Sequence, residues 1–276
     1  MTKDNLVSVT WLKAHLDDPT LVVLYTSMAD IVSGQAEPLP AGVIPGSLFF
    51  DFENEFCDKS SGLPHTMPDS ALFQRGARKL GINTNSKIVV YDSKGLYSAP
   101  RVWWMFKAMG HDNIVILDGG LPAWVASSSA VNKEFSLNDK EGDFTALTNS
   151  RSFVGASWLL SHLNQINIID ARSHGRFHGT AQEPRAGLRS GHIPGSVNLP
   201  FNQCISDGRL VPSAELQRLF SSLKINAQQH LVFSCGSGVT ACILALAACQ
   251  LGYTNVSVYD GSWSEWGAKK ELPVEC

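Results

Sequence analysis

The stretch HLVFSCGSGVTACILALAACQLG, residues 230–252, places an apolar run, a glycine-rich loop and a run of helix-forming residues one after another. The apolar run ends at Cys235, and two glycines follow within the next three positions. This succession predicts a strand, a tight turn and a helix over about 239–251. Cys235 therefore stands at the carboxyl end of a predicted strand, the end at which open parallel sheets bind their ligands.

Segments of the chain before and after Cys235 have counterparts in the other half of the sequence. The matched pairs are TWLKAHL (10–16) with SWLLSHL (157–163), VIPGSLFFD (43–51) with HIPGSVNLP (192–200), KIVVYD (87–92) with HLVFSC (230–235), and GHDNIVILDGGLPAW (110–124) with GYTNVSVYDGSWSEW (252–266). The partners are 142 to 149 residues apart and keep their order. This arrangement indicates a duplicated domain rather than a short-period repeat.

Within each half, short apolar runs alternate with helix-length segments. LVVLY, IVVY and IVIL are the runs of the first half, and INIID, LVFS and VSVY are those of the second. Strands that alternate with helices predict an α/β fold with a mainly parallel sheet, flanked by helices, in each half. Residues 127–152 are polar and lack helix or strand periodicity. We expect them to link a domain of residues 1–126 to a domain of residues 153–276.

The composition argues against several classes of protein. The chain has 276 residues, of which 44% are hydrophobic and 17% charged, and its net charge is −3. This balance predicts a globular protein with neither a nucleic-acid nor a membrane partner, and no apolar run approaches the roughly 20 residues of a membrane helix. The six cysteines include no CxxC pair, and the N-terminus has no secretory signal. We therefore expect no metal site and a cytoplasmic location.

Two features of the loop favour a reactive Cys235 over a buried structural cysteine. Gly236 and Gly238 allow backbone angles that side chains disfavour. The N–H groups of residues 236–241 can then converge on the sulfur at the start of the helix. Such a cradle favours the thiolate, which could also hold an additional sulfur as a persulfide. Gly236, Gly238, Val239 and Thr240 are the loop residues that we expect to bind the substrate.

Cysteine phosphatases have a loop of similar shape, with an arginine six positions after the cysteine. This chain has Ala241 at that position. Without the arginine, phosphate-ester hydrolysis would lose its main electrostatic stabilisation, which argues against a phosphatase.

These motifs resemble those of the two-domain sulfurtransferases of the rhodanese superfamily, over essentially their whole length. The loop CGSGVTA (235–241) is similar to that of the 3-mercaptopyruvate sulfurtransferases, whereas thiosulfate sulfurtransferases usually carry CRKGVTA, with basic residues beside the cysteine. DARSHGRFHGTAQEPRAGLRSGHIPGSVN (170–198) and DGSWSEWG (260–267) match as well. The resemblance implies two rhodanese-like domains.

The resemblance also implies a reaction. The Cys235 thiolate would take sulfur from 3-mercaptopyruvate, release pyruvate, and pass the sulfur from its persulfide to a thiol such as thioredoxin or glutathione, or to cyanide. No metal or organic cofactor is then needed. The family's two substrate arginines correspond to Arg176 and Arg185, which suit a planar carboxylate, and Arg172 is expected to be structural.

A second group of residues is implied by the same resemblance. Ser237 is expected to act with a histidine and a carboxylate from the first half, which supplies His65 and Glu53, with Asp51 as an alternative carboxylate. Such a relay could protonate the enolate of pyruvate as it leaves, or polarise the ketone.

The first half lacks the means for this chemistry, because Asp92 occupies the position that corresponds to Cys235. A carboxylate cannot carry a sulfane sulfur, so the first domain is expected to close the cleft and supply His65. Two alternatives remain at this point: a thiosulfate sulfurtransferase, and a non-enzymatic binding or sensor module that kept the fold. Of the other cysteines, Cys57 and Cys276 are expected to be exposed.

Overall fold

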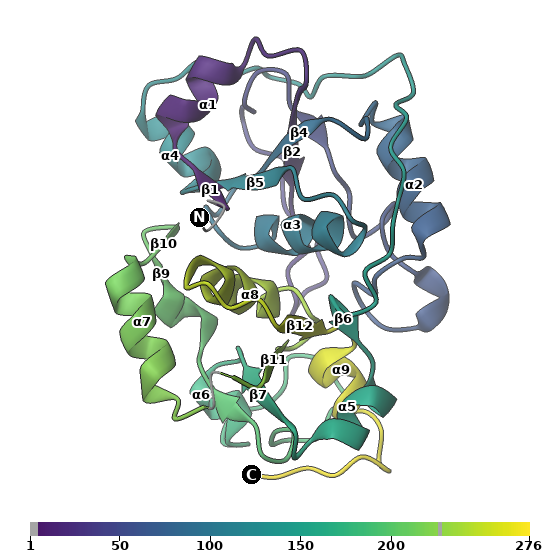
Figure 1. Cartoon of the computed structure of the whole chain (residues 1–276), viewed down its shortest axis with the longest axis vertical. Helices are drawn as coiled ribbons and strands as arrows, with labels where there is room; N and C mark the ends of the chain where they lie inside the picture. The colour runs from purple at the N-terminus through teal and green to yellow at the C-terminus, as the bar shows by residue number, and fades with distance from the viewer. Residues whose placement is uncertain (1–4, 226–227) are drawn as a thin grey trace.

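Two parallel sheets of the same topology form the framework of the molecule (Figure 1). The computed structural model describes residues 5–225 and 228–276. The first sheet has the order β1-β5-β4-β2-β3, and we call the part of the chain that carries it the first domain. Its strands are β1 (Leu6–Val7), β2 (Leu21–Thr26), β3 (Leu48–Phe49), β4 (Lys87–Asp92) and β5 (Ile114–Leu117). Strands β2, β4 and β5 form at the predicted apolar runs, because such runs suit strands that are buried on both faces, whereas the sequence analysis did not identify the two-residue strands β1 and β3.

The second domain repeats this order with β6-β12-β11-β7-β8. Its strands are β6 (Phe153–Val154), β7 (Ile166–Asp170), β8 (Val197–Asn198), β11 (His230–Ser234) and β12 (Val256–Tyr259). The central strand β11, which precedes Cys235, corresponds to β4, which ends at Asp92. An antiparallel hairpin of β9 (Ile205–Ser206) and β10 (Arg209–Leu210) is added in this domain.

Nine α-helices and two short 3-10 helices surround the sheets in the described part of the chain. The helices are α1 (Val9–His15), α2 (Ser70–Lys79), α3 (Ala99–Ala108), α4 (Gly120–Ala126), α5 (Ala156–His162), α6 (His174–Phe177), α7 (Ser213–Ser222), α8 (Ala241–Gln250) and α9 (Ser262–Trp266), with η1 (Lys59–Ser61) and η2 (Phe201–Cys204). Among the residues described, no helix is both long enough and apolar enough to cross a bilayer.

The domains meet where α3 packs against α8, between the two sheets (Figure 1). Helix α8 is apolar on every side, and its residues from Ala241 to Ala248 are all buried. A helix with no polar face must be covered all round, so it packs on its own sheet and on α3 of the other domain. One continuous apolar core therefore includes residues of both helices, among them Val102 and Leu244.

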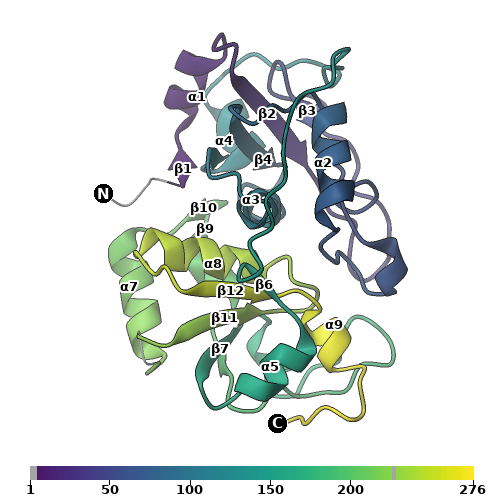
Figure 2. The same cartoon turned by 45° about the vertical axis from the view of Figure 1, so that its right-hand side comes forward.

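The segment predicted as a linker, 127–152, contains no helix and runs along the first domain toward β6 (Figure 2). It is attached to that domain: Phe144 is buried in its core, and the Phe144 and Leu147 N–H groups donate to the carbonyls of Ile82 and Met109 (3.1 and 2.9 Å). These contacts limit the freedom of the linker. The boundaries 1–126 and 153–276 stay a prediction.

Candidate active site

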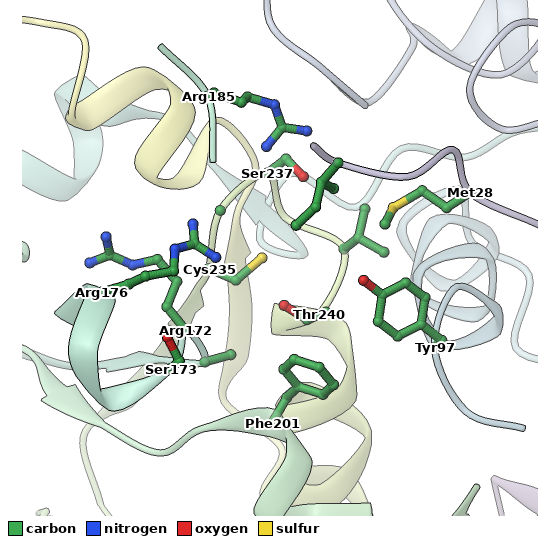
Figure 3. A pocket seen from close by; sticks show the side chains of 14 residues that line it. Met28, Tyr97, Arg172, Ser173, Arg176, Arg185, Phe201, Cys235, Ser237 and Thr240 are labelled. Atoms are coloured by element: carbon green, nitrogen blue, oxygen red, sulfur yellow. The ribbon is translucent and has the colours of Figure 1, made fainter. Parts of the chain in front are cut away.

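Cys235 lies at the carboxyl end of β11, on the wall of a cavity of about 130 Å³ between the domains (Figure 3). The side chain is almost fully buried, with 2% of its surface exposed. The second domain contributes most of the lining, including the loop after Cys235 and helix α6, and the first domain closes it with Met28, Ile31 and Tyr97. The cavity is therefore complete only when both domains are in place.

Helix α9 fixes the start of the loop. The Cys235 N–H donates to Ser262 Oγ (3.1 Å), and the Cys235 carbonyl accepts from the Trp263 N–H (2.9 Å). The Gly236 carbonyl accepts from the N–H and the hydroxyl of Ser264 (2.8 and 2.7 Å). These bonds hold the cysteine in one orientation at the cavity wall.

The two glycines of the loop are needed for different reasons. Gly238 has a φ of +75°, and an added Cβ would lie 2.8 Å from the Asp260 carbonyl oxygen, so only glycine fits. Gly236 does not adopt a left-handed conformation, although the sequence suggested the same role for both. An added Cβ at Gly236 would lie 3.1 Å from Arg176 Nη2 and 3.8 Å from Arg185 Nη1. The absence of a side chain at Gly236 therefore gives both guanidinium groups access to the loop.

The corresponding loop of the first domain shows that this backbone shape can hold a negative charge. Asp92 Oδ1 accepts from the Lys94 N–H (2.9 Å), and Oδ2 accepts from the N–H groups of Tyr97, Ser98 and Ala99 (2.8, 2.9 and 2.9 Å). Burial raises the pKa of Asp92, and these four donors oppose that effect. Successive N–H groups at the start of a helix form an anion cradle of this kind, as the sequence predicts for Cys235.

The two predicted substrate arginines both approach the loop at Gly236 but have different partners. Arg176, on α6, donates from Nη2 to Glu183 Oε2 (2.6 Å) and from Nε to both Glu183 oxygens. Arg185 extends from the following loop to the cavity, and no ion pair of its side chain occurs among the described residues. Burial lowers the pKa of Arg185, an effect that the nearby Cys235 opposes.

Glu183 also contacts Arg172, through Oε1 and Nη1 (2.9 Å). Arg172 is fully buried and forms a second ion pair with Asp170 (2.7 Å). It packs over the ring of Trp263 at 4.2 Å. The structural role expected for Arg172 agrees with these contacts.

Ser237, His65 and Glu53 form one chain of hydrogen bonds. His65 Nδ1 lies 2.9 Å from Ser237 Oγ, and His65 Nε2 lies 2.9 Å from Glu53 Oε1. The other Glu53 oxygen accepts from the Ala29 N–H (2.8 Å). Partial burial raises the pKa of Glu53, but the hydrogen bonds from His65 and Ala29 outweigh it and leave that pKa below its usual value. The alternative carboxylate, Asp51, instead bonds Asn54.

Comparison with known proteins gives the family. The chain matches the rhodanese-like domain family twice, over residues 8–127 and 155–269. The protein belongs to the rhodanese family.

Individual relatives of this rhodanese cover nearly all of it. The 3-mercaptopyruvate sulfurtransferase of Escherichia coli (strain K12) is 40% identical over 98% of this chain and 97% of its own. The mitochondrial thiosulfate/3-mercaptopyruvate sulfurtransferase 1 of Arabidopsis thaliana is 40% identical over 99% of this chain and 79% of its own. The crystal structure of SseA from Escherichia coli, a 3-mercaptopyruvate sulfotransferase, superposes with a TM-score of 0.84 at 37% identity, over 95% and 100% of the two chains.

A buried ion pair, which the sequence analysis did not identify, connects the rhodanese domains at this site. Arg101, on α3, is fully buried and donates from Nη2 to the His65 carbonyl (2.5 Å) and to Asp260 Oδ1 (2.8 Å), and from Nη1 to the Gly238 carbonyl (3.3 Å). Asp260 Oδ2 accepts from the Met67 N–H (2.8 Å). One guanidinium thus ties the segment that carries His65 to the cysteine loop. This contact matters because His65 has a φ of 61°, a strained conformation for a residue other than glycine.

The remaining cysteines lack the glycine-rich loop and the helix N-terminus that follow Cys235. Burial raises the pKa of Cys204 and Cys242 to about 12 and that of Cys249 to about 11. Cys276 is exposed as expected, but the expectation for Cys57 is wrong. Cys57 is buried because its segment folds back on itself, so that its thiol donates to the Glu53 carbonyl (2.7 Å).

No group of three or more His, Cys, Asp or Glu side chains within residues 5–225 and 228–276 is placed to hold a metal ion.

Proposed function

We propose that this chain transfers sulfane sulfur from 3-mercaptopyruvate to a thiol acceptor or to cyanide, with Cys235 as the carrier. The observation that carries the proposal is the hydrogen-bonded chain Ser237–His65–Glu53 beside the Cys235 loop. A donor that leaves as sulfite needs no proton from the enzyme, whereas a donor that leaves as an enolate does. Relatives named for this donor support the same choice.

In the first step, the Cys235 thiolate attacks the sulfur of the donor. A sulfur–sulfur bond forms and the carbon–sulfur bond breaks, with its electron pair left on the pyruvate enolate. We propose that Ser237 gives that enolate a proton, which His65 replaces, and that Glu53 orients the imidazole. We expect the N–H groups of the loop to stabilise the thiolate before attack and the persulfide after it, as those of the corresponding loop bond Asp92.

The donor's carboxylate is held away from the reacting sulfur. We propose that Arg185 binds it with its free guanidinium edge and that Arg176 contributes Nη1, the nitrogen that does not contact Glu183. Two planar donors over Gly236 suit a carboxylate beside a ketone. Val239 and Thr240, which also line the cavity, border the same space.

In the second step, a thiolate or cyanide attacks the outer sulfur of the persulfide and regenerates the Cys235 thiolate. Thioredoxin and glutathione are the thiol acceptors that we propose. The carried sulfur is bound covalently, so the cycle requires neither a metal nor an organic cofactor. Six free cysteines suit a reducing compartment, and we propose the cytoplasm.

Thiosulfate is the second candidate donor, because two guanidinium groups lie over Gly236 and would attract a dianion. Against it, the two residues that follow Cys235 are Gly236 and Ser237, and neither supplies a cation. A non-enzymatic module is less well supported, since Cys235 lines the cavity and the hydrogen-bonded His65 reaches Ser237 of the loop that follows it.

The test is to incubate the protein with 3-mercaptopyruvate and to identify the modified cysteine by mass spectrometry while pyruvate is measured. We expect one sulfur on Cys235 for each pyruvate released, and its removal by cyanide. Cys235→Ser should give neither product. Pyruvate release without sulfur on Cys235, or a persulfide only on another cysteine, would contradict the proposal.

A further inference from the structure

Glu183 is a buried carboxylate to which the sequence analysis gave no role. Its side chain is 3% exposed, and both of its oxygens are bonded to arginines: Oε2 to Arg176 (2.6 Å) and Oε1 to Arg172 (2.9 Å). Arg176 itself is 19% exposed and lines the donor cavity. Glu183 therefore lies behind the cavity wall and neutralises a charge that faces the cavity.

The pairing leaves one guanidinium of the cavity wall without a carboxylate partner in the described residues. Asp170 pairs with Arg172 and Glu183 pairs with Arg176, while Arg185 has no ion pair. Glu53, the carboxylate on the other side of Ser237, is bonded to His65. The side of the cavity that carries the arginines thus offers a single uncompensated positive charge.

We infer that Glu183 determines the preference of this site for a singly charged donor over a doubly charged one. The inference rests on the proposed function, since it explains how the cavity favours a monocarboxylate such as 3-mercaptopyruvate over thiosulfate. Glu183 acts through Arg176 and is a specificity-determining residue rather than a catalytic one.

The physical reason is that electrostatic energy scales with the charge of the ligand. An additional positive charge on the cavity wall would attract a dianion about twice as strongly as a monoanion at the same distance. The cavity is lined by buried and partly buried groups such as Cys235 and Arg176, so this difference is screened less than it would be at the protein surface. Removal of the Glu183 charge should therefore favour thiosulfate, even where it also loosens Arg176.

The test is Glu183→Gln, which removes the charge and keeps the shape and one hydrogen-bond acceptor. We expect kcat/KM for thiosulfate, divided by kcat/KM for 3-mercaptopyruvate, to rise about tenfold or more over the wild-type ratio. Glu183→Asp, which restores the charge, should keep the ratio near the wild-type value even if both rates fall. Glu215→Gln, the same change at an exposed position of α7, should alter neither rate.

A parallel fall of both donors in Glu183→Gln, with the ratio unchanged, would show a purely structural role and overturn the inference. That outcome differs from failure of the proposed function, in which the wild-type protein itself would prefer thiosulfate or release no pyruvate.

A binding measurement covers the case in which Glu183→Gln is inactive. In a Cys235→Ser background, the affinities for pyruvate and for sulfate are measured by calorimetry with and without Glu183→Gln. We expect the substitution to strengthen sulfate binding relative to pyruvate binding by about tenfold. An unchanged ratio of the two affinities would contradict the inference. If Glu183→Gln does not fold, the inference is contradicted when Glu183→Asp, which keeps the charge, shifts the kinetic ratio of the two donors away from the wild-type value.

Discussion

The unequal pairing of Arg176 and Arg185 predicts unequal effects of their removal. The sequence analysis assigns both arginines to the donor carboxylate and does not distinguish between them. Among residues 5–225 and 228–276, no carboxylate forms an ion pair with Arg185, whereas Arg176 is bonded to the buried Glu183. Arg185→Ala therefore removes one contact, but Arg176→Ala also exposes the donor to the charge of Glu183.

The magnitudes follow from these contacts. Loss of a charge-assisted hydrogen bond costs about 1.5–3 kcal/mol, so Arg185→Ala should lower kcat/KM for 3-mercaptopyruvate by about 10- to 150-fold. In Arg176→Ala, the Glu183 carboxylate would add about 2 kcal/mol of repulsion if the donor's charge is bound about 8 Å away, at an effective dielectric of about 20. The loss in that variant should therefore be several hundredfold to several thousandfold. It should also lower the melting temperature, because a buried carboxylate loses one of its two partners.

The assay is steady-state pyruvate release, accompanied by thermal unfolding of each variant. Arg218→Ala, at an exposed position of α7, controls for the loss of one surface charge and should behave as wild type. Wild-type kinetics in Arg185→Ala would refute the assignment of the carboxylate site. Equal losses and equal melting temperatures in the two variants would refute the electrostatic reasoning about Glu183.

Three further predictions concern Cys235, Arg101 and the other cysteines. Cys235→Ser should abolish sulfur transfer without unfolding the protein, and substantial turnover in this variant would contradict the role of Cys235 as the carrier. Its counterpart Asp92→Ala should change turnover less than about threefold. It should lower the melting temperature, because it leaves four N–H donors unpaired. In Arg101→Lys, no planar group remains to bond all three acceptors. The substitution should lower kcat with 3-mercaptopyruvate about tenfold and kcat with thiosulfate less. Equal losses of kcat with the two donors would mean that Arg101 does not act through His65. At about pH 7.5, iodoacetamide should modify Cys204, Cys242 and Cys249 slowly because their pKa values are raised to about 11–12, and rapid labelling of any of them on peptide mapping would count against the burial argument.

Much of the fold could be predicted because the features that specify it are local or repeated. Strands buried on both faces require apolar runs, and the matched pairs of segments place the two sheets in the same topology. The loop after Cys235 could be predicted for the same reason, since glycine at position 238 and a helix from Ala241 are properties of consecutive residues.

The arrangement of the charged groups could not be predicted in this way. Spacing along the chain does not distinguish Glu53 from Asp51, because the choice depends on the irregular path between them and the left-handed His65. Glu183 is close to Arg185 in the sequence but bonds Arg176, since the chain turns back after α6.

The role of Arg101 depends on how the two domains pack. The sequence gives one signal, a single arginine in the otherwise apolar run PRVWWMF of α3. A charge in such a run must find partners when the helix is buried, but the sequence does not say which ones. Those partners, the His65 carbonyl, the Gly238 carbonyl and Asp260, come from three distant segments.

The most direct test of the account is a comparison of the two donors on the unmodified protein. With cyanide as a common acceptor, kcat/KM is measured for 3-mercaptopyruvate and for thiosulfate under the same conditions. The uncharged loop at Gly236 and Ser237, the single unpaired Arg185 and the hydrogen-bonded His65 together predict a ratio of at least about tenfold in favour of 3-mercaptopyruvate, a difference of about 1.4 kcal/mol. Equal use of the two donors, or a preference for thiosulfate, would contradict it.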